Sequence, residues 1–175
     1  LIGASGGPKW LILSELDKVL GTELLRERSE PLMLLGSSIG TWRHACLSLP
    51  DPAAAISRLQ QAYLHQEYSC ARPSPSEVSQ VAEQMLREAL GPEGARQITN
   101  HPTLHNAIVT ARAKGVARGE SGWKLGMGMA TATLGNAVSR KGLELLFDRV
   151  AFCHGELSAL PFTDGFHTQL NAINE

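Results

Sequence analysis

A serine flanked by two glycines follows an apolar run in residues 31–42, PLMLLGSSIGTW. Gly36, Ser38 and Gly40 fit the pattern G-x-S-x-G, in which a sharp strand-to-helix turn lifts the serine hydroxyl clear of a sheet. A hydroxyl held in this way can attack an acyl carbonyl once a base accepts its proton. The flanking positions must be small because the turn brings them close to the neighbouring strand and helix. Ser38 is therefore the candidate nucleophile, and Ser37 is the neighbouring alternative.

A second glycine-rich stretch, GASGGPKW, follows the first two residues. Backbone N–H groups of such a loop can donate to the oxyanion of a tetrahedral intermediate, and losing one donor typically costs about 3 kcal/mol in the transition state. If the strands before the two turns are parallel neighbours, this loop lies beside Ser38. We then expect oxyanion donors at Gly6, Gly7 and Ile39. A phosphate-binding loop is the alternative, although G-x-G-x-x-G and G-x-x-x-x-G-K-[ST] are both absent.

Together the two motifs resemble the patatin-like phospholipases, serine acyl hydrolases built on an α/β sheet. The resemblance implies that Ser38 is the nucleophile, that Gly6 and Gly7 form the oxyanion hole, and that Lys9 matches the basic position of the loop. It covers mainly the first 50 residues. It implies a lipid or other acyl-ester substrate and neither a metal nor an organic cofactor.

The glycine loop departs from the family pattern at positions where small residues are usual, namely Ser5, Pro8 and Trp10. These departures leave open a second interpretation from another functional class. In that interpretation the chain keeps the fold but binds a lipid or a partner protein without catalysis.

The base that would activate the serine has two candidate sources. In the patatin-like family it is an aspartate in a D-G-G or D-G-A sequence, and the Asp-Gly pair in this chain, Asp164-Gly165, continues with Phe166. The resemblance therefore implies either Asp164 or an aspartate beyond Glu175. A Ser-Asp-His triad is the alternative, with its acid and histidine drawn from Asp148, Asp164, His154 and His167.

Hydrophobic spacing predicts the elements that position these residues. Only 35 residues precede Gly36, which leaves room for one strand and one helix, fewer elements than ordinary α/β-hydrolases place before this turn. The order strand, helix, strand, helix predicts a three-layer α/β/α fold with a mainly parallel sheet and a helical insertion in the middle, in one domain over residues 1–175. The expected strands are 1–2, 32–36, 104–113 and 148–155, and the expected helices are 11–20, 39–49, 52–68 and 74–90, the last capped by Ser74 or Ser76.

The composition limits the classes of partner. The chain is 43% hydrophobic and 19% charged, with a formal net charge of -1, as in ordinary globular proteins. Its 16 Lys and Arg are scattered, so we expect no nucleic-acid partner. Its three cysteines lack paired spacing, which argues against a disulfide framework or a zinc site and favours the cytoplasm.

Two further segments bear on membranes and on the chain ends. The 14 uncharged residues 125–138 would extend about 21 Å as a helix, short of the roughly 30 Å hydrocarbon core. We therefore expect a core helix there, or a surface element that contacts lipid, which allows peripheral membrane contact. The start, LIGASGG, shows no secretory signal, and LNAINE ends in a polar stretch without a finished element, so we expect both termini to be cut.

Overall fold

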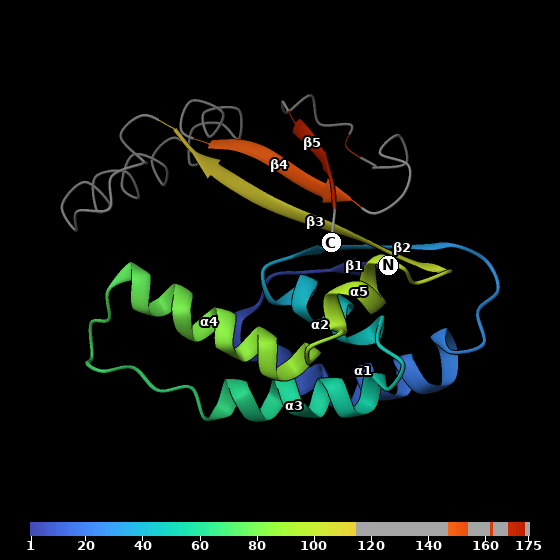
Figure 1. Cartoon of the computed structure of the whole chain (residues 1–175), viewed down its shortest axis with the longest axis horizontal. Helices are drawn as coiled ribbons and strands as arrows, with labels where there is room; N and C mark the ends of the chain where they lie inside the picture. The colour runs from blue at the N-terminus through green and yellow to red at the C-terminus, as the bar shows by residue number, and fades with distance from the viewer. Residues whose placement is uncertain (115–146, 154–161, 163–167, 174–175) are drawn as a thin grey trace.

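The computed structural model describes residues 1–114, 147–153, 162 and 168–173 of the chain (Figure 1). A five-stranded sheet lies on one side of it. Its strands follow sequence order across the sheet and are β1 (Ile2–Gly3), β2 (Leu32–Ser37), β3 (Leu104–Ala113), β4 (Phe147–Cys153) and β5 (Thr168–Ala172). The pairs β1–β2, β2–β3 and β4–β5 are parallel, whereas β3–β4 is antiparallel. The predicted α/β fold with a mainly parallel sheet is therefore confirmed.

The described helices all lie on the same side of the sheet in Figure 1. Crossovers between parallel strands are right-handed in nearly all proteins, and β1, β2 and β3 step in one direction across the sheet, so their crossovers share a face. The described residues thus form two layers, helices and sheet, and the second helical layer of the expected α/β/α fold is not among them. The helical segments are the 3-10 helix η1 (Gly7–Leu13), α1 (Ser14–Val19), the π-helix η2 (Leu20–Leu25), α2 (Ile39–Leu47), α3 (Pro52–Leu64), α4 (Pro75–Leu90) and α5 (Gly94–Thr99).

Apolar side chains fill the space between the helices and on both faces of the sheet. One buried cluster joins η1, α2, α3 and α4, and in it Trp10 packs edge-on against Tyr63 with ring centroids 5.9 Å apart. A second cluster packs Leu34 of β2 and Leu104 of β3 against Leu47 of α2. A third lies around Ala107, Ala151 and Cys153 of β3 and β4. The first two clusters fix α2 against the sheet.

Helix boundaries follow the predicted capping chemistry only in part. Ser74, not Ser76, caps α4, because its hydroxyl accepts a hydrogen bond from the Glu77 amide at 3.1 Å. Of the helix expected over residues 11–20, residues 11–13 belong to η1, so that α1 begins only at Ser14, and the helical segment continues as η2 to Leu25. Gly21 lies within η2 and packs directly against Pro52, where a Cβ would lie 2.6 Å from the proline ring.

Two further features differ from the sequence-based expectation, and one expectation is not tested. Residues 170–172 were expected in an unfinished polar end, yet they belong to β5, because pairing with β4 satisfies the backbone of this polar segment. Helix α5 was not anticipated from its sequence, GARQIT. The interpretation of residues 125–138 as a core helix or lipid-contact element lies outside the described residues.

Candidate active site

Ser38 occupies the turn between β2 and α2 in a backbone conformation that L-amino acids rarely adopt. Its φ is 53° and its ψ is -133°, and among the described residues it is the only non-glycine with positive φ. Such a conformation costs on the order of 1–3 kcal/mol and persists only where the surroundings impose it. Ser38 is exposed, whereas Ser37 is the last residue of β2 and is half-buried. The turn therefore presents Ser38 at the carboxyl end of a parallel strand.

The two flanking glycines make this turn possible because neighbouring backbone occupies the space of a side chain. A Cβ on Gly36 would lie 2.7 Å from Thr41 Cα and 2.8 Å from Thr41 N. A Cβ on Gly40 would overlap the Gly3 backbone and lie 2.9 Å from the Ala4 carbonyl oxygen. The sequence-based reason for the glycines, close approach of strand and helix, matches this geometry.

The glycine-rich loop after β1 lies against the turn, as the parallel pairing of β1 and β2 requires. Gly3 of β1 is the register partner of Gly36. Ser5 is the second residue after β1. Its hydroxyl lies 3.0 Å from the Ser37 hydroxyl and donates to the Ser37 carbonyl at 3.3 Å. The amides of Gly6 and Gly7 follow directly, and Gly7 has a positive φ of 50°. The loop thus contacts the turn through Ser5, a contact that the sequence analysis did not predict.

Helix α2 directs its N-terminus at the same place. The Thr41 amide donates to the Ser38 carbonyl at 2.9 Å, so the first turn of the helix begins at Ser38. The first N–H groups of a helix have no partner within it, and they carry the positive end of the helix dipole. The Ile39 amide is the first N–H group of this helix.

A buried ion pair holds α2 in place behind the site. Arg43 donates two hydrogen bonds to the Asp17 carboxylate of α1, Nε to Oδ2 at 2.6 Å and Nη2 to Oδ1 at 2.7 Å. Asp17 is almost wholly buried and Arg43 is largely so. A bidentate pair of this kind fixes both position and rotation of the helix that begins at Ser38.

His44, on the same helix, belongs to the interior rather than to the exposed site. It is 3% exposed, and a Cβ on Gly3 would lie 2.7 Å from its ring. Burial lowers the pKa of His44 to about 4, assisted by the positive charges of Arg43 and the amino terminus. At neutral pH the imidazole is therefore uncharged and packs beneath β1.

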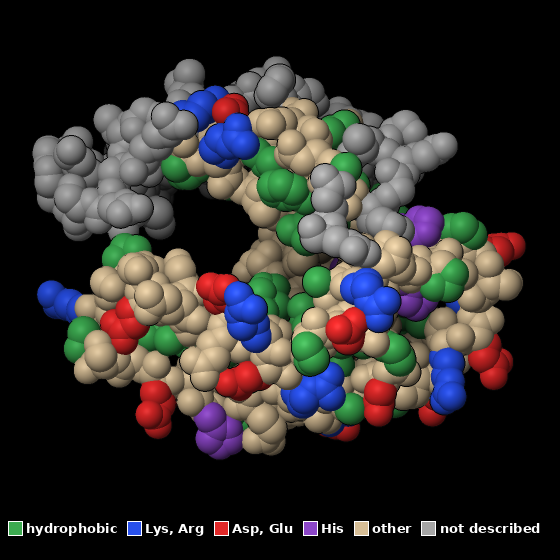
Figure 2. All heavy atoms as spheres, in the orientation of Figure 1, with side chains coloured by type: hydrophobic (Ala, Val, Ile, Leu, Met, Phe, Trp, Pro, Cys, Tyr) green, Lys and Arg blue, Asp and Glu red, His purple; other side chains and the backbone are tan. Residues whose placement is uncertain are grey.

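A cavity of about 450 Å³ opens beside Ser38, within the usual range for ligand pockets. It lies between α2, α4, α5 and β3, and the molecule is hollowed between α4 and β3 in Figure 2. Its lining is mostly apolar and includes Ala45, Leu86, Leu90, Ile98 and Ile108. Ser38 thus borders a space suited to a hydrocarbon group.

Two polar residues that line this cavity were missed by the sequence analysis. Thr41 Oγ1 and Asn106 Oδ1 are buried and have no hydrogen-bond partner among the described residues. The available signal was Asn106 itself, a polar residue inside the apolar strand LHNAIV, since buried polar groups in strands usually serve a hydrogen bond or a ligand.

The candidate bases are only partly within the described residues. Asp164, His154 and His167 lie outside them. Asp148 is described, and its Oδ1 accepts a hydrogen bond from Lys114 Nζ at 2.6 Å. Asp148 is on β4, two strands away from β2, so the structure does not bring it beside Ser38. Lys9, the expected basic residue of the loop, is exposed in η1.

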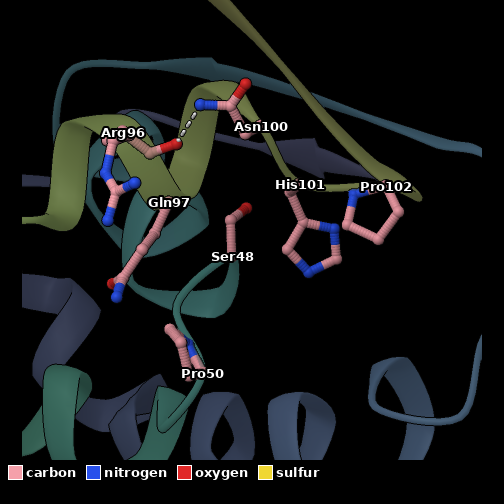
Figure 3. Close-up of a pocket in the computed structure, with 7 residues that line it drawn as sticks. All are labelled: Ser48, Pro50, Arg96, Gln97, Asn100, His101 and Pro102. Atoms are coloured by element: carbon pink, nitrogen blue, oxygen red, sulfur yellow. Dashed lines mark hydrogen bonds between the residues drawn. The ribbon is translucent and has the colours of Figure 1, made fainter.

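A second cavity of similar size, about 460 Å³, lies at the opposite edge of the parallel strands (Figure 3). It is bordered by Ser48, Arg96 and His101, at the amino end of β3. His101 Nδ1 accepts hydrogen bonds from the Thr103 and Leu104 amides at 3.2 and 2.9 Å, and burial lowers its pKa. Its ring is therefore held by the chain entering β3 and does not approach the serine.

Comparisons of the chain with protein-family models, with curated proteins and with solved structures found no match. In the part of the chain that the structure describes, no helix is both long and apolar enough to cross a membrane. The same part contains no group of three or more His, Cys, Asp and Glu side chains arranged to hold a metal ion.

Proposed function

We propose that this chain is a serine acyl hydrolase of the patatin-like type, with the three-layer fold of that family, and that it cleaves lipid or other acyl esters. The observation that carries the proposal is the backbone of Ser38, φ 53° and ψ -133°, held between two glycines at the end of a parallel strand. Strain of this kind concentrates at functional sites. The adjacent apolar cavity supplies a place for the acyl group.

In the proposed reaction, Ser38 Oγ attacks the ester carbonyl carbon while its proton passes to a carboxylate base. The carbonyl oxygen becomes an oxyanion, which accepts hydrogen bonds from the amides of Gly6, Gly7 and Ile39. Collapse of this intermediate breaks the bond to the alcohol, which leaves with the proton from the base. Water then attacks the acyl-enzyme by the same route, releasing the carboxylic acid and restoring the serine hydroxyl.

The patatin-like resemblance supplies the remaining parts of the proposal. The base is an aspartate, for which Asp164 is the candidate in this sequence, and the reaction needs no metal or organic cofactor. We assign the protein to the cytoplasm, with peripheral contact to membranes where its lipid substrates reside.

Covalent labelling with a fluorophosphonate probe tests the proposal directly, because the probe reacts with activated serines. We expect a single adduct that peptide mass mapping locates at Ser38. Ser38→Ala should abolish labelling, whereas the matched variant Ser37→Ala should retain it. An unlabelled Ser38 in the folded protein, or an adduct at Ser37, would contradict the assignment.

A non-catalytic lipid- or protein-binding relative is the second candidate. It is favoured by the glycine loop, in which Pro8 lacks an N–H group and η1 begins at Gly7. For such a protein, the folded chain should bind fatty acid or a partner while Ser38 remains unlabelled. The same labelling experiment therefore separates the two candidates.

A further inference from the structure

The cavity beside Ser38 has a polar residue at its inner end. Asn106 is 3% exposed and lies among apolar neighbours on the helix-facing side of β3. Its Oδ1 has no hydrogen-bond partner among the described residues. An unpaired buried amide oxygen costs about 1–3 kcal/mol, so its retention calls for a partner that arrives from elsewhere.

Hydrogen bonding fixes which amide atom is left over. The Ser48 hydroxyl donates its only proton to the His44 carbonyl at 3.0 Å, at the last turn of α2. Ser48 Oγ can then only accept a hydrogen bond from Asn106. The Asn106 atom that lies 2.8 Å from Ser48 Oγ is therefore the donor Nδ2. Asn106 Oδ1 is consequently the free acceptor, and the ligand group that suits it is a hydrogen-bond donor.

The strand register sets the distance between this acceptor and the nucleophile. Ser37 is opposite Val109 on β3, while Leu34 is opposite Asn106. Asn106 therefore lies three residues, or about 10 Å along the strand, from the position of Ser37, the residue before the nucleophile. Thr41 Oγ1, the other unpaired atom, lies over Gly36 at the turn instead, where a Cβ would be 2.9 Å away. The acceptor at the inner end is thus Asn106.

We infer that Asn106 is a specificity-determining residue that selects acyl chains bearing a hydrogen-bond donor, such as a hydroxyl group, near their far end. This inference rests on the proposed acyl transfer at Ser38. The acyl carbonyl lies at the turn, the chain follows the apolar wall of α2 and α4, and the distal hydroxyl donates to Asn106 Oδ1, which is buried in this structure and is reached when the side chain shifts toward the cavity that it lines. Hydroxylated medium-length acyl esters are the substrate class.

The test compares the labelling rates of two fluorophosphonates that differ only at the chain end, an octyl and an ω-hydroxyoctyl probe. In the wild type we expect the hydroxylated probe to react about fivefold to tenfold faster, the effect of one neutral hydrogen bond. Asn106→Leu removes the acceptor and should bring the rate ratio close to one. Ser48→Ala is the matched control, because it breaks the same Asn106–Ser48 bond yet leaves Oδ1 in place, and it should keep the preference.

Each outcome separates this inference from the proposed function. If neither probe labels Ser38, the acyl-transfer proposal fails and takes the inference with it. If both label Ser38 at equal rates in the wild type, the inference alone is overturned. A loss of preference in both Asn106→Leu and Ser48→Ala, with both variants folded by circular dichroism, assigns Asn106 a structural role and also overturns it.

Discussion

At the scale of single residues, the site is defined by what the turn does to the Ser38 backbone. Neighbouring segments impose the positive φ: Gly40 packs on the Gly3 backbone, and Gly36 packs on Thr41. The serine side chain gains exposure from this arrangement at an energetic cost to the fold. Function and stability should therefore conflict at this one position.

Replacing Ser38 with glycine should stabilise the protein, because glycine adopts positive φ without steric strain. We expect Ser38→Gly to unfold at a higher urea concentration than Ser38→Ala, by about 1 kcal/mol in unfolding free energy. Both variants lose the hydroxyl, so neither should be labelled by a fluorophosphonate. A glycine variant less stable than the alanine variant would show that the turn stores no strain.

The pKa of His44 gives the protein a predictable dependence on acid. It is about 4 in the folded protein, whereas histidine in an unfolded chain titrates near its ordinary value of 6.5. Between these values the unfolded state binds more protons, so the free energy of unfolding decreases as the pH falls. Above pH 6.5 the titration of His44 does not change the free energy of unfolding. Near pH 4 it has lowered the free energy of unfolding by about 3 kcal/mol.

Urea denaturation at a series of pH values tests this dependence. His44→Gln should be less sensitive to acid than the wild type between about pH 6.5 and pH 4. Other groups titrate in both proteins, so the difference between the two curves isolates His44. Parallel curves would mean that the imidazole becomes protonated inside the fold or that burial does not lower its pKa.

At the scale of elements, sequence pattern predicted what local chemistry determines. The run LMLLG before G-x-S-x-G was enough to predict β2, the turn and α2, since strand, glycine spacing and helix agree there. Ser74 was one of two predicted caps, and its hydroxyl is the one that accepts a hydrogen bond from the Glu77 amide. The antiparallel β3–β4 pair and the polar strand β5 depend on partners distant in sequence, so no local pattern could reveal them.

The candidate site, too, was predictable only where residues close in sequence determine it. Ser38 and its glycines follow from spacing, and the position of the N-terminal loop follows from the parallel pairing of β1 and β2. The role proposed for Asn106 depends on Ser48, 58 positions earlier in the chain. Tertiary packing alone brings these two side chains together.

The Asp17–Arg43 pair couples α1 to α2 and should behave as a buried ion pair. Arg43→Met leaves the Asp17 carboxylate buried without its partner, which should cost about 3–5 kcal/mol of unfolding free energy. The double variant Asp17→Leu/Arg43→Met should recover most of that loss. On the surface, Arg87→Met breaks the exposed Arg87–Glu83 pair and should cost less than about 1 kcal/mol.

Chemical denaturation of the four proteins measures these differences. The expected order of stability places Arg43→Met well below the other three. A double variant as unstable as Arg43→Met would show that the methylene stems of these side chains, and not the uncompensated charge, carry the effect.

At the scale of the whole molecule, two cavities of nearly equal volume lie at opposite ends of the parallel strands, about 450 Å³ beside Ser38 and about 460 Å³ beside His101. Open α/β sheets bind ligands at the carboxyl ends of their strands. Chain topology, rather than cavity size, therefore favours the cavity at Ser38 as the ligand site. It is built from α2, α4, α5 and β3, which come together only in the folded chain.

Filling each cavity in turn tests this distinction. Ala45 lies on the α2 wall of the Ser38 cavity, and Gln97 borders the cavity at the other edge. Ala45→Trp should slow labelling of Ser38 by a long-chain alkyl fluorophosphonate about tenfold or more, since excluding two methylene groups at about 0.8 kcal/mol each has that effect. An ethyl fluorophosphonate, which does not need the cavity, should be slowed much less.

Gln97→Trp places an indole at the opposite edge of the sheet, so it should leave the labelling rates of both probes unchanged. Thermal unfolding of the two variants checks that each indole is accommodated without loss of the fold. If Ala45→Trp slows both probes equally, the effect comes from the turn and not from the cavity. If Gln97→Trp is the variant that discriminates between chain lengths, the acyl group occupies the amino-end cavity, and the direction of the parallel strands is then no guide to where this molecule binds its ligand.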